Sequence, residues 1–374
     1  FQSVIRGGSD TINVNIKDPD IEMDGEEFNH IKNLINSLSS TLYGNDPFNK
    51  DNGYFHVADR ETFADFYIVN EISKNVDARF YSSCFANLTT YDRLYMGPLW
   101  DFDIAFNNDD RLGDATQKLM RTYAHDPKTW IARWWQDAGF VANVKARWAE
   151  VRKAGVKEFM INYINSTEEY LESSQQNNFQ RWNILNKIVY RELAARGTYE
   201  AEVDFLRQYV GNRISYLDNQ FSLPQMFDVT VSTSNSAMGS AVSNSIHAFA
   251  NDQVTLTATA KDGYEFVNWT VNGIEVSKAN PYTTTITETT QFKANFEKDF
   301  YTIKVTAEEG GTVKSTKEGE VLNGTEVTLT ATPSKGYNFV NWTVNGEEVS
   351  TSATYTVTVT KDVEYIANFI THKV

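Results

Sequence analysis

The sequence predicts a multidomain α+β protein, in which a mainly helical N-terminal region with one small β-hairpin precedes two small β-rich repeat modules. Three observations support this prediction. Apolar residues recur at steps of three and four through much of residues 26–221, as in amphipathic helices. Apolar and polar residues alternate before residue 106, as in strands. Beyond residue 226 the same stretches occur twice. A chain of 374 residues has room for two or three domains.

The composition is that of a folded, acidic protein. Hydrophobic residues make up 41% of the chain and aromatic residues 13%. The formal net charge of −15 argues against nucleic acid and anionic lipid as partners. No apolar run is long enough to span a membrane.

Cysteine and histidine usage excludes several kinds of site. Cys84 is the only cysteine, so neither a disulfide framework nor a cysteine-based zinc site can form. The five histidines show no pair at metal-ligand spacing. We expect Cys84 to be a small buried residue rather than a nucleophile, because no histidine lies near it in the sequence.

The predicted elements follow one another along residues 11–221. A strand over residues 11–16 precedes a helix over residues 26–42, and Asp59 is a good N-cap for a second helix that runs to about Lys74. Residues 80–88 and 92–106 are predicted to pair as strands. Long helices are predicted over residues 140–164, 166–195 and 198–221. We expect Trp130, Trp134 and Trp135 to pack between helices.

The most informative stretch for chemistry is Trp100–Phe106. Four bulky apolar residues alternate there with Asp101, Asp103 and Ala105. As a strand it would hold the two carboxylates on one face, about 7 Å apart, where they could bind a hard cation. The alternative is a solvated face on which aspartate is merely tolerated. Aspartate is depleted in strands, which favours function.

A second carboxylate, Asp77, lies just past the second helix. Two carboxylates such as Asp77 and Asp101, one to orient a hydroxyl and one to hold Mg²⁺, are what phosphoryl transfer needs. Taken alone, Asp77 is better explained as a helix-terminating residue that bonds to its own backbone. Lys74 could contact phosphate, but a solvated helix end is the simpler interpretation.

The last 148 residues contain an internal repeat. The sequence beginning at Val254 recurs at Val327, and the one beginning at Gly263 recurs at Gly336, both at an offset of 73 residues (327 − 254; 336 − 263). Each copy carries an Asn-Gly pair that type I′ hairpin turns prefer. The repeated Tyr, Phe and Trp residues favour the core of a small β-module over a sugar-binding platform.

The repeats resemble the divergent B-repeat of internalin B. The Gly-Tyr-x-Phe-x-x-Trp and Ala-Asn-Phe elements carry the resemblance, which covers residues 227–374. It implies a β-grasp-like or small all-β module that acts as a spacer or adhesion unit on an exported bacterial protein.

Residues 1–222 resemble the CotH kinase family, named for a spore-coat protein. The resemblance depends on three motifs in this order: Asp59…Asn70-Glu71, Asn75-x-Asp77 and Gly97-Pro98-x-Trp100-Asp101-x-Asp103. It implies the helical C-lobe of an atypical protein kinase that uses ATP and Mg²⁺ or Mn²⁺ to phosphorylate serine or threonine in a protein partner. It assigns Asp77 as the catalytic residue, Asn75 as a cofactor-binding residue that frames it, and Asp101 and Asp103 as the metal ligands.

Two departures from the family pattern stand out. The chain begins where the nucleotide lobe and its phosphate-contacting lysine should end, so we expect a piece of a larger protein, inactive without that lobe. In addition, kinases place a metal-binding asparagine shortly after the catalytic aspartate. Here Ser82 and Ser83 follow Asp77, and the first asparagine is Asn87.

Two functions follow from these observations. The first is an exported kinase-like protein with three domains, residues 1–222, 223–299 and 300–374. The second is a non-catalytic binding or adhesion protein whose kinase-like region is a degenerate scaffold. Both place the chain outside a bacterial cell or on its surface, with a protein substrate or surface partner.

Overall fold

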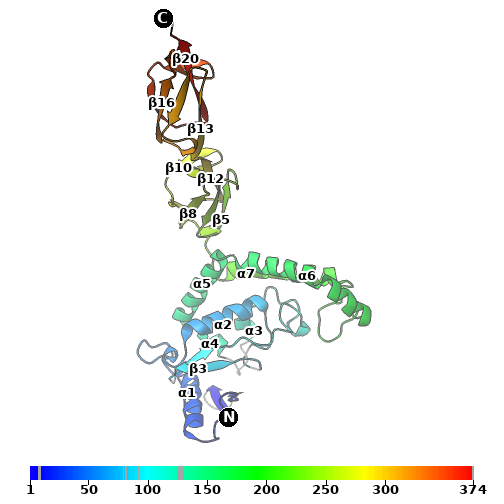
Figure 1. The fold of residues 1–374 in the computed structure, drawn as a ribbon. Coiled ribbons are helices and arrows are strands. Elements are labelled where there is room, and N and C mark those ends of the chain that lie inside the picture. The colour runs from blue at the N-terminus through cyan, green and yellow to red at the C-terminus, as the bar shows by residue number, and fades with distance from the viewer. Residues whose placement is uncertain (7–9, 79, 81, 91, 124–129, 373–374) are drawn as a thin grey trace. The chain divides into compact units, whose positions relative to one another are not determined.

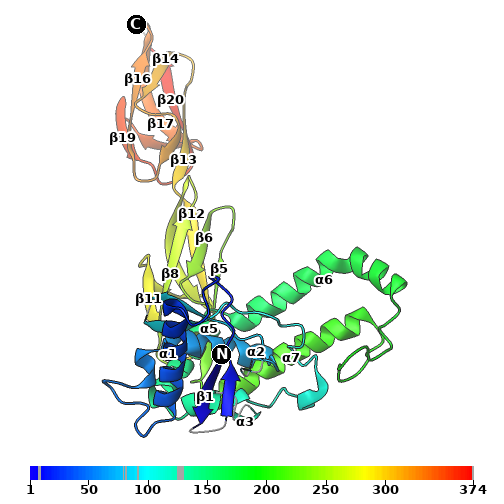
Figure 2. The same ribbon diagram turned by 90° about the horizontal axis from the view of Figure 1, so that it is seen from below.

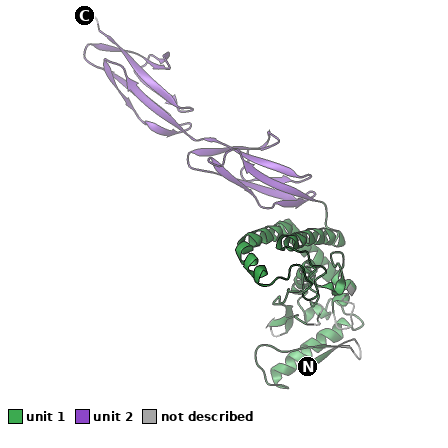
Figure 3. Cartoon of the chain, turned by 90° about the vertical axis from the view of Figure 1, so that its right-hand side faces the viewer, with its two compact units in different colours: residues 1–225 green, residues 226–374 purple. Residues whose placement is uncertain are grey.

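The computed structural model describes residues 1–6, 10–78, 80, 82–90, 92–123 and 130–372 (Figure 1). The chain divides into two compact units, Phe1–Gln225 and Met226–Val374 (Figure 3). No helix in the described part of the chain is both long and apolar enough to cross a membrane.

The first unit is mainly helical, with two small hairpins. In chain order its elements are β1 (Gln2–Arg6), β2 (Asp10–Asn13), α1 (Glu26–Leu42), the 3₁₀ turn η1 (Tyr54–His56), α2 (Arg60–Ser73), β3 (Ala86–Thr90), β4 (Arg93–Met96), the 3₁₀ turn η2 (Asp110–Leu112), α3 (Met120–Tyr123), α4 (Ile131–Trp134), α5 (Ala138–Lys153), α6 (Val156–Arg181) and α7 (Tyr199–Gln220). β1 pairs with β2, and β3 with β4, both antiparallel.

Helix α2 lies at the centre of this unit and contacts α5, α7 and β4 (Figure 1). The carboxylate of Asp59 caps its start, accepting from the Thr62 amide at 2.8 Å, as the sequence predicts. Phe63 and Tyr67 on α2 are fully buried against aromatic rings of the following helices. Trp130 and Trp134 belong to the same core, whereas Trp135 is partly buried at its edge.

The predicted strand over residues 92–106 is wrong beyond Met96, where β4 ends. Backbone φ is 126° at Gly97, 63° at Asp101 and 56° at Phe106, and none of these values suits an extended strand. Pro98 also lacks the N–H that a strand ladder needs. Residues 97–107 therefore form an irregular loop despite their alternation. β3 likewise begins only at Ala86, and Tyr81 of its predicted strand lies outside the described residues.

Two predicted helices also differ from the structure. The helix predicted over residues 140–164 is two helices, because Gly155 at φ 80° separates α5 from α6. The helix predicted over residues 166–195 ends at Arg181. Ile184, Ile188 and Val189 beyond it are β-branched and exposed, so their low helix propensity is not offset by packing.

The second unit consists of two β-modules with the same topology. The first contains β5 (Met226–Thr233), β6 (Gly239–Ser243), β7 (His247–Phe249), β8 (Gln253–Ala260), β9 (Tyr264–Val271), β10 (Ile274–Ser277), β11 (Tyr282–Thr285) and β12 (Thr290–Lys298). The second contains β13 (Phe300–Ala307), β14 (Gly311–Ser315), β15 (Gly319–Leu322), β16 (Glu326–Pro333), β17 (Tyr337–Val344), β18 (Glu347–Ser350), β19 (Thr354–Thr358) and β20 (Val363–Thr371).

Each module packs a five-stranded sheet against a three-stranded one. The orders β10-β9-β12-β5-β7 and β11-β8-β6 of the first recur as β18-β17-β20-β13-β15 and β19-β16-β14 in the second. The described residues of both modules are in strands, turns and loops, so of the two predicted forms the all-β one is observed. Asn272 and Gly273 both have positive φ, as do Asn345 and Gly346, which fits the predicted hairpin turns.

A β-bulge explains how the repeated aromatic residues share one core. The register of β9 against β12 shifts between Asn268 and Phe266, which leaves Val267 as the extra residue. In a regular strand, residues three positions apart point to opposite faces, as Phe266 and Trp269 would. The bulge places both rings on one face, with their centroids 5.4 Å apart. Trp269 and its counterpart Trp342 are fully buried, so these tryptophans belong to the core rather than to a sugar-binding surface.

We expect Trp342→Ala to destabilise the second module by about 3–5 kcal/mol, because it opens a large cavity in a small core. Hydrogen exchange of the β16 and β17 amides in the full chain measures this loss. Ile370→Ala is the matched control, because Ile370 is exposed and its truncation should change stability by less than about 0.5 kcal/mol. Equal effects of the two variants would contradict the core assignment.

Candidate functional site

The site predicted around Asp77 begins where α2 ends. Lys74 follows the helix with φ 55° and ψ 46°, a left-handed conformation that turns the chain away from the helix axis. Asn75 and Val76 are buried beneath this turn, and Asp77 emerges from it partly exposed.

The side chain of Asn75 joins the two aspartates that the sequence singles out. Its Nδ2 donates to the backbone carbonyl of Asp101 at 2.8 Å, and its Oδ1 accepts from the backbone N–H of Asp77 at 3.1 Å. One buried amide therefore brings together two segments that lie 24 residues apart. The backbone N–H of Asp77 thus bonds to Asn75, and not to its own carboxylate as a simple helix-terminating aspartate would arrange it.

The carboxylate of Asp77 forms an ion pair. Its Oδ1 lies 3.2 Å from Nη1 of Arg111 in η2. Arg111 also binds the carboxylate of the buried Asp109 through Nε, at 2.8 and 3.0 Å. Burial alone would raise the pKa of Asp109, but the hydrogen bonds from Arg111 outweigh it and lower that pKa. Asp109 thus holds the guanidinium that faces Asp77.

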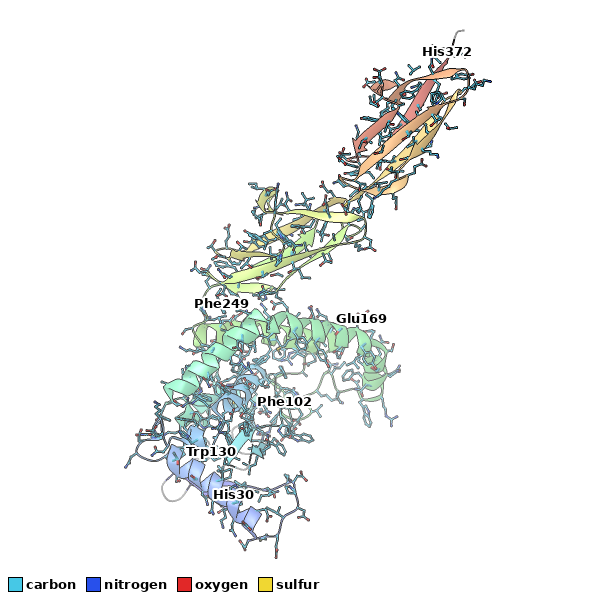
Figure 4. The ribbon with its side chains drawn as sticks, turned by 60° about the vertical axis from the view of Figure 1, so that its left-hand side comes forward. His30, Phe102, Trp130, Glu169, Phe249 and His372 are labelled. Carbon is cyan, nitrogen blue, oxygen red and sulfur yellow. The ribbon has the colours of Figure 1, made fainter. Side chains whose placement is uncertain are left out.

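Asp101 differs from Asp77 in its exposure and its partner. It is exposed, and its Oδ2 accepts a hydrogen bond from the hydroxyl of Ser83 at 2.9 Å. Two residues further on, Asp103 is also exposed. Among the residues that the structure describes, its carboxylate forms no hydrogen bond or ion pair. Phe102, labelled in Figure 4, lies between them.

The backbone around these residues is strained. Of the non-glycine residues described with positive φ, six lie within residues 74–107: Lys74, Phe80, Ser83, Asp101, Phe106 and Asn107. Such conformations cost on the order of 1–3 kcal/mol each and gather at active sites and ligand clamps. The cluster surrounds the Asn75 bridge, which makes this stretch the best candidate for a functional site.

A buried polar network lies under the turn. Oε2 of Glu71 on α2 accepts from Nη2 of Arg213 at 2.5 Å. Its Oε1 accepts from the Met120 amide at 2.6 Å and from the hydroxyl of Tyr67. Arg213 also donates to the backbone carbonyls of Glu71, Thr116 and Lys118. Glu71 and Arg213 are both fully buried, so α7 fixes the end of α2.

The prediction that Lys74 is a solvated helix end is wrong. Its side chain is buried, with Nζ 3.5 Å from the Glu71 carboxylate and 2.5 Å from the Lys118 carbonyl. Burial lowers the pKa of Lys74 to about 7, against a smaller raising effect of Glu71. The left-handed turn points the side chain back into the helix end, where Glu71 and Arg213 already lie.

Cys84 has no sign of a reactive thiol. It is partly exposed as a residue, but its thiol is enclosed, and this burial raises the pKa of the thiol to about 12. The Phe80 amide donates to its sulfur at 3.4 Å. A thiol with so high a pKa is protonated at neutral pH and is a poor nucleophile.

The oxygen donors at the site are of the kind that Mg²⁺ prefers. Asp101 and Asp103 are exposed carboxylates, and Ser83 supplies a hydroxyl beside the first. Within the described part of the chain, no three acidic, histidine or cysteine residues gather closely enough to form a metal site. Mg²⁺ is usually held by one or two carboxylates together with water and substrate phosphates, so the donor set fits this ion.

Sequence reasoning missed three residues here. Arg111 is one of them, because its link to Asp77 spans 34 residues and no local pattern records it. Glu71 and Arg213 are 142 residues apart, and no local pattern connects them. A glutamate on the apolar side of a helix was the one signal available for the buried network.

Comparison with known proteins shows the relationships of both units. Residues 2–217, more than half of the chain, match the CotH kinase protein family. The chain belongs to that family. Residues 229–300 and 301–373 each match the divergent InlB B-repeat domain. No curated protein matches the chain.

One solved structure is similar in part. It is the major pilin protein T-13 of Streptococcus pyogenes, at 10% identity and a TM-score of 0.19, and the match covers 39% of this chain and 96% of that one. A TM-score this low carries no argument about the fold.

We expect Asn75→Ala to destabilise the CotH unit by about 1–3 kcal/mol, because it leaves a buried N–H and carbonyl without their partner. Urea denaturation of the full chain measures the change. Asn108→Ala is the control: Asn108 is exposed and donates to the Asp103 carbonyl, so its loss should cost less than about 0.5 kcal/mol. If Asn108→Ala lowers the free energy of unfolding as much as Asn75→Ala does, the Asn75 bridge contributes no more to stability than an exposed asparagine.

The buried Lys74 predicts a pH dependence of stability. Its pKa falls from 10.5 in the unfolded chain to about 7 in the folded one, so between these values the unfolded state binds the extra proton. The free energy of unfolding should therefore rise with pH above about 7, by at most about 1.4 kcal/mol per pH unit. The rise should level off near pH 10.5.

Urea denaturation of the wild type and of Lys74→Met across this range isolates the effect, because other titrating groups cancel in the difference. The stability of the wild type relative to Lys74→Met should increase with pH. A difference that stays constant would show that Lys74 keeps the same protonation state when the chain folds.

Proposed function

We propose that the CotH unit is a phosphotransferase of the protein-kinase type, acting on serine or threonine hydroxyls of a protein with ATP. One observation carries the proposal: the Asn75 amide bonds to the backbones of both Asp77 and Asp101. Phosphoryl transfer depends mainly on positioning and charge neutralisation, so two aspartates held by one buried side chain are the essential requirement.

In this proposal Asp77 orients the substrate hydroxyl. The contact of its carboxylate with Arg111 uses Oδ1, so Oδ2 is the oxygen that would accept a hydroxyl proton. Arg111 holds the carboxylate in place, because Asp109 binds the guanidinium in turn. Asn75 then acts through the backbones of the two aspartates, and its assignment as a cofactor-binding residue remains a prediction.

Asp101, with Asp103 beside it, would hold Mg²⁺ or Mn²⁺. Such an ion neutralises the charge of ATP phosphates. Ser83 orients the Asp101 carboxylate by donating to Oδ2, so Oδ1 is the oxygen left for a cation. Asp101 is exposed, so its carboxylate is accessible to a cation from solvent.

The proposal extends to the whole chain as three domains, residues 1–222, 223–299 and 300–374. The two B-repeat modules support a location on or outside a bacterial cell, where they would space or attach the CotH unit. The family match and the repeats support this arrangement, and the protein substrate is a surface or exported protein.

A second function is a non-catalytic surface-binding protein with a kinase-like scaffold. Two observations favour it. The carboxylate proposed as catalytic is already paired with Arg111 at 3.2 Å, and the described residues contain no cluster of three metal-binding side chains. In that case the Asn75 bridge would serve only the fold.

Phosphotransfer and binding assays separate these functions. With ATP and Mg²⁺ we expect a protein that carries this unit together with a nucleotide lobe to transfer labelled γ-phosphate to protein. Transfer should fall at least about a hundredfold in Asp77→Asn and Asp101→Asn, because each removes an anionic group that the transition state needs. Asp65→Asn is the control, since Asp65 lies on the exposed face of α2 in an ion pair with Arg147.

Thermal denaturation supplies the second measurement. Binding of ATP and Mg²⁺ should raise the unfolding temperature of the wild type and of Asp65→Asn, and raise that of Asp101→Asn less. Phosphotransfer that persists in Asp101→Asn would overturn the assignment of that residue. In a protein that also carries the nucleotide lobe, absence of both transfer and a thermal shift would favour the scaffold function instead.

A further inference from the structure

The segment between α6 and α7 has an unusual surface. Five large apolar side chains of residues 182–190 are exposed: Trp182 at 56%, Ile184 at 37%, Ile188 at 58%, Val189 at 61% and Tyr190 at 72%. Soluble proteins rarely gather so many in one short stretch, and such patches mark interaction sites. We call residues 181–191 the apolar-basic segment.

The charge of this segment is opposite to that of the chain. Residues 181–191 contain Arg181, Lys187 and Arg191 and no acidic residue, in a chain whose net charge is −15. Arg191 lies 3.4 Å from Asp110 in an exposed ion pair. Within the described ranges, Arg181 and Lys187 belong to no ion pair, so both remain available to an anionic partner.

An aromatic and a cationic side chain lie next to each other at each end of the segment. The Arg181 guanidinium lies 5.3 Å from the Trp182 ring centroid, and that of Arg191 lies 5.6 Å from the Tyr190 ring. Tryptophan and tyrosine favour the boundary between water and lipid, because each ring has an apolar body and a polar edge. Arginine and lysine beside them can bind headgroup phosphates while their stems rest on apolar material.

The local backbone presents these side chains without forming a groove. Helices α6 and α7 run side by side in Figures 1 and 2, and the segment is the irregular connection between them. The Gly197 amide donates to the Leu185 carbonyl, and the Val189 and Tyr190 amides donate to the Glu192 carboxylate. The loop is thus internally fixed while its apolar side chains point outward. Figure 4 labels Glu169 on α6, which precedes it.

We propose that the apolar-basic segment is a peripheral attachment site for an anionic lipid surface. A bilayer takes up exposed apolar side chains without shape complementarity, and its negative charge matches Arg181 and Lys187, the two cations that belong to no ion pair among the described residues. Residues 182–191 form neither strand nor helix, so the strand edge and helix face that many peptide-binding sites use are not present in this segment. The proposal is independent of the phosphotransfer activity.

The acidic character of the whole chain does not oppose this contact. Electrostatic interactions are screened within about 8 Å at physiological ionic strength, so a lipid headgroup senses the nearby cations far more than distant acids. The expectation that anionic lipid is excluded holds for the chain on average but not for this segment. The Arg191–Asp110 pair also places it next to η2, which carries Arg111 of the candidate site.

Co-sedimentation of the full chain with vesicles tests the proposal. We expect binding to vesicles of phosphatidylcholine with phosphatidylglycerol, weak or no binding to phosphatidylcholine alone, and weaker binding at high salt. Each of Arg181→Gln and Lys187→Gln should lower the affinity about fivefold, the share of one cation near an anionic surface. A combined Trp182→Ser, Ile188→Ser and Tyr190→Ser variant should lose it.

Tyr170→Ser is the matched control, because Tyr170 is exposed at 85% on α6 but lies outside the segment. It should bind vesicles like the wild type, and circular dichroism should show every variant folded. Equal binding to both vesicle compositions, no binding to either, or an equal loss in Tyr170→Ser would overturn the proposal. If a protein displaces the chain from vesicles, and its own binding to the chain is lost in Trp182→Ser, the segment is a binding site for that protein instead.

Discussion

The contact between Arg213 and Glu71 determines how the CotH unit is assembled. The guanidinium binds the Glu71 carboxylate and the carbonyls of Glu71, Thr116 and Lys118, with no exposure to solvent. Removing one partner of such a pair leaves a buried charge, which costs several kcal/mol. Through Arg213, α7 therefore holds together the end of α2 and the residues before α3. The turn at Lys74 begins at this contact.

The strained backbone after α2 depends on that fixed point. Lys74, Asp101 and Phe106 adopt positive φ, which costs energy that a loop alone would avoid by relaxing. The Phe106 amide donates to the Ser73 carbonyl at 2.5 Å, and the Asn75 amide holds Asp101. Because both anchors lie at the end of α2, the helix end that precedes Asp77 also sets the conformation of the loop that carries Asp101.

Local signals in the sequence predicted some features well and others not at all. The N-cap Asp59 and the apolar spacing after it gave α2 correctly, and a constant offset of 73 residues revealed the repeats. The alternation of Trp100–Phe106 misled, because burial in this loop does not follow a period of two. Trp100 is 61% exposed, whereas Ala105 is buried. Lys74 was misjudged because its burial depends on Arg213, a contact between distant parts of the chain that no local pattern records.

The two modules show which repeated residues the fold itself requires. Asn295 donates to the Asn268 side chain at 2.8 Å beside the bulge of β9, and Asn368 donates to Asn341 at 2.9 Å in the second module. The repeated tryptophans are buried, so architecture accounts for both motifs. Positions that differ are a better guide to binding: Ile274, exposed at 71%, corresponds to Glu347 at the same place in β18. The same edge strand therefore carries one apolar side chain in the first module where the second carries an acidic one, and the two modules do not present identical surfaces to a partner.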